Sequence, residues 1–180
     1  MPFYSSDVEV LIDSATLDAR IRELGAAITR DYAGLDLTLV GIMKGSAFFL
    51  TALAQAVDLP AKIEFMGVSS YRGGTETTGE VRITHDLTEP IFGHHVLVVE
   101  DIIDTGLTMR FLMDNLAARH PASLKLAGLL EKPARARVKV PIDYRGFVVD
   151  DRFLVGFGLD FQERYRNLPF IGVLKGAPGG

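Results

Sequence analysis

The sequence predicts one α/β domain with a parallel sheet covered by helices on both faces. Short and nearly continuous apolar runs, which are typical of buried strands, alternate along the chain with segments of helical apolar spacing. Strands that alternate with helices favour a parallel sheet with helices on both sides. Of the 180 residues, 48% are hydrophobic, which is enough for one sizeable core, and neither a linker nor an internal repeat divides the chain.

The first part of the chain predicts two helices and two strands. Apolar residues recur at steps of three and four from Leu17 to Tyr32, which predicts a helix. Asp13 or Ser14 can cap its start, and Gly34 can end it. The elements that follow are a buried strand, a second amphipathic helix and another strand, over residues 37–43, 49–57 and 62–69.

Residues 71–88 differ from their surroundings because they are mostly polar and contain the adjacent Gly73 and Gly74. Long loops inside compact domains are uncommon and are often functional. We therefore expect a long mobile loop here, with room for a short hairpin.

The second half continues the alternation of strands and helices. The run within 95–100 is the most strand-like in the chain, and residues 108–119 then have helical spacing. His94 and His95 have no spaced partners that would complete a metal site, so we expect them at the surface. Further strands are expected over 124–130, 147–149 and 153–159, and the glycine-rich tail 176–180 is expected to fray.

Charge and composition exclude several classes of function. The formal net charge of −4 gives no electrostatic reason for binding nucleic acid or an anionic membrane. The absence of cysteine rules out disulfides, thiolate metal sites and a cysteine nucleophile, and it suits a reducing cytoplasm. The N-terminal residues do not resemble a signal peptide, and the longest apolar runs are far shorter than a membrane span. We therefore expect a cytoplasmic protein without membrane contact.

An ordered string of polar residues follows the strand expected at 95–100. Glu100 and Asp101 come at its end, and acids that are partly buried need partners such as sugar hydroxyls or hydrated Mg²⁺. Ligands of open α/β sheets bind outside the carboxyl ends of the strands, where these acids would lie. An acidic loop that merely caps a helix is the alternative, and the order of the whole string argues against it.

The next residues form a loop from Asp104 to Thr108 at the start of the expected helix. The N–H groups and the dipole at a helix N-terminus favour an anion. The hydroxyls of Thr105 and Thr108 add donors, and Gly106 lets the backbone approach a ligand closely. The loop is therefore expected to bind a monophosphate.

This segment resembles the phosphoribosyl pyrophosphate signature of the type I phosphoribosyltransferases, and its form is similar to that of the hypoxanthine-guanine phosphoribosyltransferase family. The likeness extends from the Met43-Lys44-Gly45 turn to Arg166. It implies a small hood at the carboxyl edge of the sheet, from about residues 1–12 and 147–180, and a mobile lid over about 70–88. It also implies a purine salvage enzyme that transfers the phosphoribosyl group of 5-phosphoribosyl 1-pyrophosphate to hypoxanthine, and to guanine, forming IMP or GMP and pyrophosphate.

The resemblance assigns roles to individual residues. It implies that the phosphoribosyl group and its 5′-phosphate are bound by Glu100, Asp101, Asp104, Thr105, Gly106, Leu107 and Thr108. Pyrophosphate would be bound by Lys44, Gly45, Ser70, Tyr71 and Arg166, and the peptide bond before Lys44 can be cis. The purine would be bound by Lys132, Phe153, Leu154 and Asp160, and Mg²⁺ by Glu100, Asp101 and Asp160. Asp104 would be the general base for the N7 proton.

The purine side of the site has the clearest competing interpretations. The family's lysine, here Lys132, donates to the 6-oxo group, but the same residue could be a surface charge beside Arg135 and Arg137. Phe153 would stack on the base, but a core phenylalanine is the commoner fate of one such residue. A lysine donor would be unpaired opposite the amino group of adenine, so a 6-oxopurine is favoured.

Some alternatives stay open. Hypoxanthine, guanine and xanthine share the 6-oxo group, and adenine or orotate is less favoured. A regulator of the same fold that binds nucleotides or RNA without turnover is the alternative from another class. The negative charge and the intact set of Asp104, Lys132 and Asp160 favour an enzyme. Relatives of this fold commonly associate, so the resemblance implies a homodimer or homotetramer.

Overall fold

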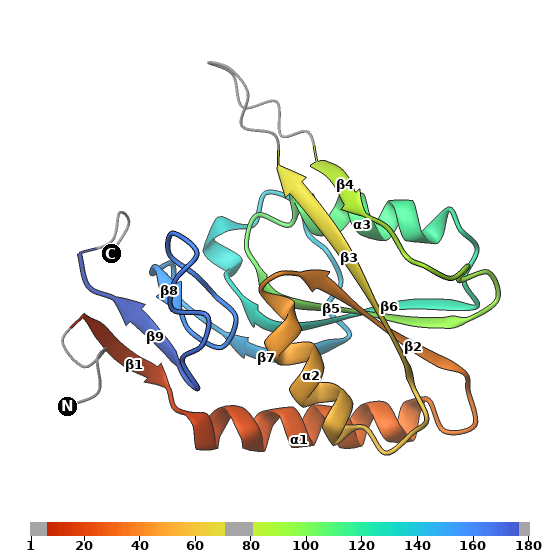
Figure 1. The fold of residues 1–180 in the computed structure, drawn as a ribbon, viewed down its shortest axis with the longest axis horizontal. Helices are drawn as coiled ribbons and strands as arrows, with labels where there is room; N and C mark the ends of the chain where they lie inside the picture. The colour runs from red at the N-terminus through yellow and green to blue at the C-terminus, as the bar shows by residue number, and fades with distance from the viewer. Residues whose placement is uncertain (1–6, 71–80, 177–180) are drawn as a thin grey trace.

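The computed structural model describes residues 7–70 and 81–176. Its largest sheet contains β2 (Leu37–Met43), β3 (Lys62–Ser70), β4 (Val81–His85), β5 (His95–Ile103), β6 (Ser123–Glu131) and β7 (Tyr144–Val148). The order across this six-stranded sheet is β4-β3-β2-β5-β6-β7, and every pair is parallel except β3 with β4. The predicted parallel α/β sheet is therefore confirmed (Figure 1).

In the described part of the chain, the helices that accompany this sheet are α1 (Ser14–Asp31), α2 (Ser46–Ala56) and α3 (Leu107–Ala117), together with the short 3-10 helix η1 (Pro133–Arg135). Asp13 is the N-cap of α1, because its Oδ1 accepts a hydrogen bond of 2.8 Å from the N–H of Thr16. Gly34 turns the chain after α1 with a φ of 78°. Within the described ranges, none of the helices has the length and apolarity needed to cross a membrane.

Strand β5 is buried on both faces, which explains its continuous apolar run. Leu97 and Val99 belong to the core formed with α1 and α2, whereas Val96 and Val98 belong to the core formed with α3. All four side chains are inaccessible to solvent. Because successive side chains of a strand point to opposite faces, this central strand joins the two cores and fixes the position of its own carboxyl end.

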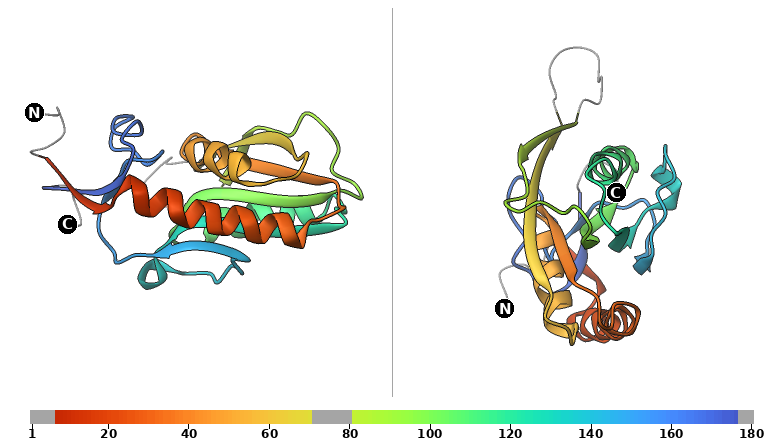
Figure 2. Two further views of the ribbon diagram at one scale, coloured as in Figure 1. Left: turned by 90° about the horizontal axis from the view of Figure 1, so that it is seen from below. Right: turned by 90° about the vertical axis from the view of Figure 1, so that its right-hand side faces the viewer.

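A second, antiparallel sheet forms the hood. It contains β1 (Val8–Ile12), β8 (Leu154–Val155) and β9 (Ile171–Leu174) in the order β1-β9-β8. The first and last strands of the described residues, β1 and β9, thus lie side by side, beyond the carboxyl ends of the parallel strands (Figures 1 and 2).

Two predicted boundaries in this region were wrong. The strand expected at 147–149 begins at Tyr144 and ends at Val148 in the large sheet, so the hood begins after it. The strand expected at 153–159 has only two residues, because Gly156, Phe157 and Gly158 have φ angles of 97°, 46° and 102°. Positive φ angles turn the chain out of an extended conformation.

The predicted loop over 71–88 is described only in part. Residues 71–80, which include most of the predicted lid, lie outside the described residues. Residues 81–85 form β4 and pair antiparallel with β3, as a hairpin would. The tail beyond residue 176 is also outside the described part of the chain. His95 was expected at the surface but is half-buried, and its Nδ1 lies 2.8 Å from Ser123 Oγ.

Candidate active site

The acids at the end of β5 are half-buried. Oε2 of Glu100 is enclosed and has no hydrogen-bond partner in the described structure. Oδ1 of Asp101 accepts a hydrogen bond of 2.8 Å from the N–H of Ile102. Burial raises the pKa of Glu100 well above its ordinary value, and the charge of Asp101 adds to this effect. Burial also raises the pKa of Asp101 to about 6, against the opposing backbone hydrogen bond from Ile102.

The loop after β5 leads directly into α3. Gly106 has a φ of 79°, and a side chain there would overlap the carbonyl group of Val138. The carbonyl of Thr105 accepts from the N–H groups of Arg137 and Val138 at 3.0 and 3.1 Å, which holds the loop against the segment after η1. Glycine is thus required by both backbone conformation and space.

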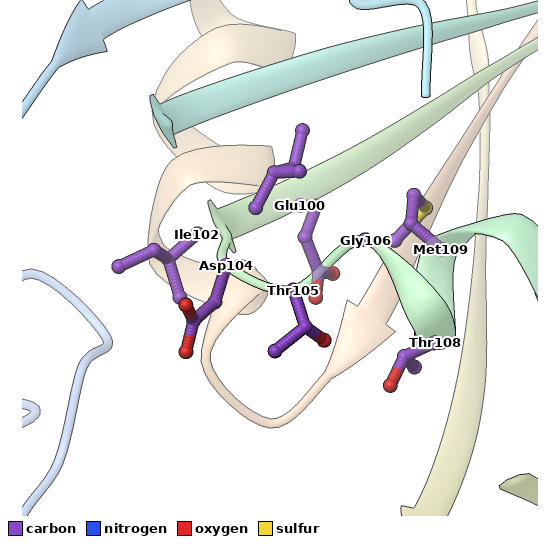
Figure 3. Close-up of a pocket in the computed structure, with 8 residues that line it drawn as sticks. Glu100, Ile102, Asp104, Thr105, Gly106, Thr108 and Met109 are labelled. Carbon is purple, nitrogen blue, oxygen red and sulfur yellow. The ribbon is translucent and has the colours of Figure 1, made fainter. Parts of the chain in front are cut away.

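A cavity of about 110 Å³ lies at this loop. The carboxylates of Glu100 and Asp104 and the hydroxyls of Thr105 and Thr108 project to the same side of the strand end (Figure 3). The backbone N–H groups at the start of α3 have no carbonyl partner within their own helix. The cavity therefore combines acids at the strand end with N–H and hydroxyl donors at the helix start, an arrangement that favours an anion. Its lining residues are Glu100, Ile102, Ile103, Asp104, Thr105, Gly106, Thr108 and Met109.

The turn between β2 and α2 lies against Asp101. A side chain at Gly45 would overlap the Asp101 carboxylate, and a side chain at Gly158 would overlap the carbonyl group of Gly45. The Met43–Lys44 peptide bond is cis, which the resemblance allowed. The backbone of this turn therefore contacts both the Asp101 carboxylate and Gly158 of the hood.

Opposite charges gather where this turn meets the hood. Lys44 Nζ lies 2.9 Å from Glu163 Oε2. Arg166 Nη2 lies 2.9 Å from Asp160 Oδ1 and 3.2 Å from Glu163 Oε1, and its Nη1 donates to the carbonyl of Gly158 at 2.7 Å. The two cations that the resemblance assigned to pyrophosphate are thus brought together through one carboxylate.

Lys132 follows β6 and is buried, with an exposed fraction of 6%. Its Nζ donates to the carbonyl of Arg152 at 2.6 Å and lies 3.7 Å from Asp151 Oδ1. Its backbone N–H donates to the carbonyl of Ile103, which fixes the end of β6 beside the end of β5. The interpretation of Lys132 as a surface charge is therefore wrong. An ammonium has three N–H donors, so it can serve a ligand while it keeps these contacts.

Phe153 comes directly after Arg152, whose carbonyl accepts the hydrogen bond from Lys132 Nζ. Its ring packs edge-on against that of Phe161, with centroids 5.4 Å apart. Leu154 is buried in the main core, so only its backbone is available to a ligand.

Asp104 has a partner that sequence reasoning missed. Arg135 Nε lies 3.0 Å from Asp104 Oδ1, an ion pair without hydrogen-bond alignment, and its Nη1 lies 3.5 Å from Asp151 Oδ1. Glu163, between Lys44 and Arg166, was missed as well. Arg135 is three residues after Lys132 and Glu163 is three before Arg166, and this proximity to expected site residues was the available signal.

Of the remaining expected pyrophosphate ligands, Ser70 is the last residue of β3 and pairs with Val81 of β4. Tyr71 lies outside the described residues. The other expected residues form two groups on either side of the end of β5. Lys44, Gly45, Asp160 and Arg166 lie near Asp101, and Lys132 lies near Asp104. Phe153 packs against Phe161 in the hood.

The acids fit a magnesium ion that is shared with a substrate. Within residues 7–70 and 81–176, no three acidic or histidine side chains are grouped closely enough to hold a metal by themselves. Mg²⁺ usually keeps several waters and takes one or two carboxylates together with substrate phosphates. The enclosed Oε2 of Glu100 has no hydrogen-bond partner in the described structure, which leaves this oxygen available to such an ion.

Comparison with known proteins agrees with this arrangement. The family model described as "Phosphoribosyl transferase domain" matches residues 11–162. The hypoxanthine-guanine phosphoribosyltransferase of Streptococcus pneumoniae is 47% identical over 167 residues, which cover 93% of each chain. The bifunctional protein TilS/HprT of Listeria monocytogenes is 48% identical, and the chain spans 26% of its length.

Solved structures agree as well. A hypoxanthine phosphoribosyltransferase from Staphylococcus aureus has a TM-score of 0.92 at 44% identity, covering 97% of this chain and 95% of its own. A hypoxanthine phosphoribosyltransferase from Trypanosoma cruzi, described with the role of its C-terminal region in oligomeric state and activity, has a TM-score of 0.89 at 36% identity, covering 94% and 93%. The chain therefore belongs to the phosphoribosyltransferase family and, within it, to the hypoxanthine-guanine phosphoribosyltransferases.

Proposed function

We propose that the protein transfers the phosphoribosyl group of 5-phosphoribosyl 1-pyrophosphate to a nitrogen of hypoxanthine or guanine and releases pyrophosphate. The observation that carries this proposal is the position of the buried Lys132 beside Asp104, at the neighbouring ends of β6 and β5. A 6-oxopurine presents an oxygen that accepts a hydrogen bond from an ammonium and, nearby, an N7 proton that a carboxylate can take. The two side chains therefore match two neighbouring features of the base.

In this proposal, different residues bind different parts of phosphoribosyl pyrophosphate. The loop from Asp104 to Thr108 holds the 5′-phosphate with N–H and hydroxyl donors. Glu100 and Asp101 bind the ribose hydroxyls. Lys44 and Arg166 bind the leaving pyrophosphate, where negative charge develops in the transition state.

The base is bound on the other side of Asp104. Lys132 donates to the 6-oxo group while the carbonyl of Arg152 holds its Nζ in place, 2.6 Å away. Phe153 supplies an aromatic face for stacking. Asp104 takes the N7 proton, directly or through one water, once that nitrogen is within about 2.6–3.2 Å.

Magnesium is part of the proposal. Glu100 and Asp101 would hold magnesium on the ribose side, and Asp160 would hold it on the pyrophosphate side, in each case together with substrate oxygens and water. When bound, the ion neutralises charge on the leaving pyrophosphate. The enclosed and unpartnered Oε2 of Glu100 supports this assignment.

Location and assembly belong to the same proposal. A cysteine-free chain suits the reducing cytoplasm, which we propose as its location. We propose a homodimer or homotetramer, because relatives of this fold commonly associate, and the relative from T. cruzi is described by the role of its C-terminal region in oligomeric state. The net charge of −4 supports small-molecule partners rather than nucleic acid.

One assay tests the proposal. The purified protein is mixed with phosphoribosyl pyrophosphate, Mg²⁺ and one base at a time, and pyrophosphate release is followed. Hypoxanthine and guanine should support release, whereas adenine should not, because its amino group would face the Lys132 ammonium without an acceptor. Xanthine shares the 6-oxo group and is the other base to include. Absence of release with every purine would contradict the proposal and favour a regulator that binds nucleotides without turnover.

A further inference from the structure

The carboxylate of Glu163 lies between Lys44 and Arg166, the two cations that bind pyrophosphate in the proposed function. Its Oε2 is 2.9 Å from Lys44 Nζ, and its Oε1 is 3.2 Å from Arg166 Nη2. One carboxylate thus contacts both cations, each with a different oxygen, as two oxygens of pyrophosphate would. The reaction described above gives Glu163 no role.

The turn that presents Glu163 has an unfavourable backbone conformation. Phe161 and Arg164 exchange both of their backbone hydrogen bonds, at 3.1 and 3.0 Å, which leaves Gln162 and Glu163 at the tip. These two residues have φ angles of 53° and 62°, in the region that glycine and asparagine prefer. The N–H of Glu163 donates to Asp160 Oδ2 at 2.9 Å and helps to hold the tip. Residues other than glycine persist in this region where their surroundings hold them, often at functional sites.

We propose that Glu163 is an internal mimic of the pyrophosphate anion, which closes the pyrophosphate subsite of the empty enzyme and is displaced by the substrate. The inference rests on the proposed function and deepens it. The Glu163 side chain is 65% exposed, so it can move into water while Lys44 and Arg166 exchange one anionic partner for another. Breaking these contacts consumes part of the binding free energy of both phosphoribosyl pyrophosphate and pyrophosphate. Glu163 therefore weakens substrate binding and speeds release of the product.

Glu163→Gln tests this role because it keeps the size of the side chain and removes its charge. The KM for phosphoribosyl pyrophosphate and the inhibition constant of pyrophosphate should both fall by about three- to tenfold, since exposed ion pairs are individually weak. The KM for hypoxanthine should stay the same, because the base does not contact these cations. Initial rates at constant Mg²⁺ and ionic strength give all three constants.

Two further variants separate the mimic from a general change of charge. Glu163→Asn should shift the same constants in the same direction, because asparagine tolerates a positive φ and is too short to span both cations. Glu23→Gln is the matched control and should leave all constants at wild-type values. The Glu23 side chain is also 65% exposed, and its carboxylate pairs at 2.7 Å with Arg20, an arginine three residues away on α1.

The outcomes distinguish this inference from the proposed function. If the wild type is active and both Glu163 variants keep or raise the KM for phosphoribosyl pyrophosphate, Glu163 is not an anion mimic. A shift of equal size in Glu23→Gln would also overturn the inference, because net charge alone would then explain it. A wild type that binds neither phosphoribosyl pyrophosphate nor pyrophosphate, measured by calorimetry with Mg²⁺, would overturn the proposed function.

Discussion

Asp104 and Lys132 stand at the ends of neighbouring strands, and each has its own counter-ion. Arg135 Nε lies 3.0 Å from Asp104 Oδ1, and Asp151 Oδ1 lies 3.7 Å from Lys132 Nζ. Arg135 also approaches Asp151, at 3.5 Å, so the four charges alternate in sign along a row. The Arg135 guanidinium restricts the orientation of the Asp104 carboxylate, and a general base needs such a fixed position.

The variant Asp104→Asn should lose about 10²–10⁴ in kcat, because the amide keeps the shape of the carboxylate but cannot take the N7 proton. Its affinity for phosphoribosyl pyrophosphate should change much less, since the phosphate donors of the loop remain. Single-turnover rates and calorimetry measure the two effects. The control is Asp114→Asn, which should behave as the wild type. Asp114 is an exposed residue of α3 that pairs with Arg110. Nearly full activity of Asp104→Asn would show that another group is the base.

Single contacts were the least predictable part of the site. The buried state of Lys132 depends on the carbonyl of Arg152, 20 residues further along the chain. The contact between Lys44 and Glu163 joins residues 119 positions apart. Sequence spacing contains no information about such pairs until the hood is placed over the sheet, so the sequence was also compatible with Lys132 as a surface charge.

At the scale of elements, the unit from β5 to α3 was predictable because its determinants are local. A buried strand, two acids, a glycine at positive φ and a helix start follow one another within residues 95–117. The short strand β8 was overestimated for the opposite reason. The apolar residues Leu154, Val155 and Leu159 resemble a strand, but the glycines at 156 and 158 allow positive φ angles that turn the chain back.

Another contact between elements gives a test of stability. Asp86, just after β4, accepts two hydrogen bonds from Arg119, just after α3, at 2.8 and 3.0 Å. These hydrogen bonds lower the pKa of Asp86 below its ordinary value of 3.8, against a smaller opposing effect of burial. Because the folded-state pKa is the lower one, the ion pair contributes stability above pH 3.8, and this contribution is lost as the pH falls through the folded-state pKa.

We therefore expect Asp86→Asn to lower the free energy of unfolding at pH 7 by about 0.5–1 kcal/mol, a modest amount because solvent screens a half-exposed pair. The difference from the wild type should shrink as the pH falls below 3.8. Urea unfolding of both proteins over a series of pH values measures it. A difference that stayed constant over the whole series would mean that the Asp86 carboxylate does not stabilise the fold through its charge.

At the scale of the whole molecule, the site forms where the hood meets the carboxyl edge of the large sheet. Lys132 reaches from β6 to the carbonyl of Arg152, and the turn at Gly45 lies against Gly158 of the hood. The sequence predicted a hood at this edge through its resemblance to a known family. Local patterns could not predict the pairing of β1 with β9, because Val8 pairs with Leu174 at the other end of the chain.

The kinetics of Lys132→Gln test most directly the central claim that a buried lysine at this junction selects the 6-oxo group. The loss of a hydrogen bond from a charged donor should lower kcat/KM for hypoxanthine and for guanine together, by about 10- to 150-fold. The KM for phosphoribosyl pyrophosphate should change little. Lys125→Gln, on the same strand but against the rings of Tyr32 and Tyr144, is the control and should keep wild-type kinetics. Unchanged kcat/KM of Lys132→Gln for both bases would contradict the claim.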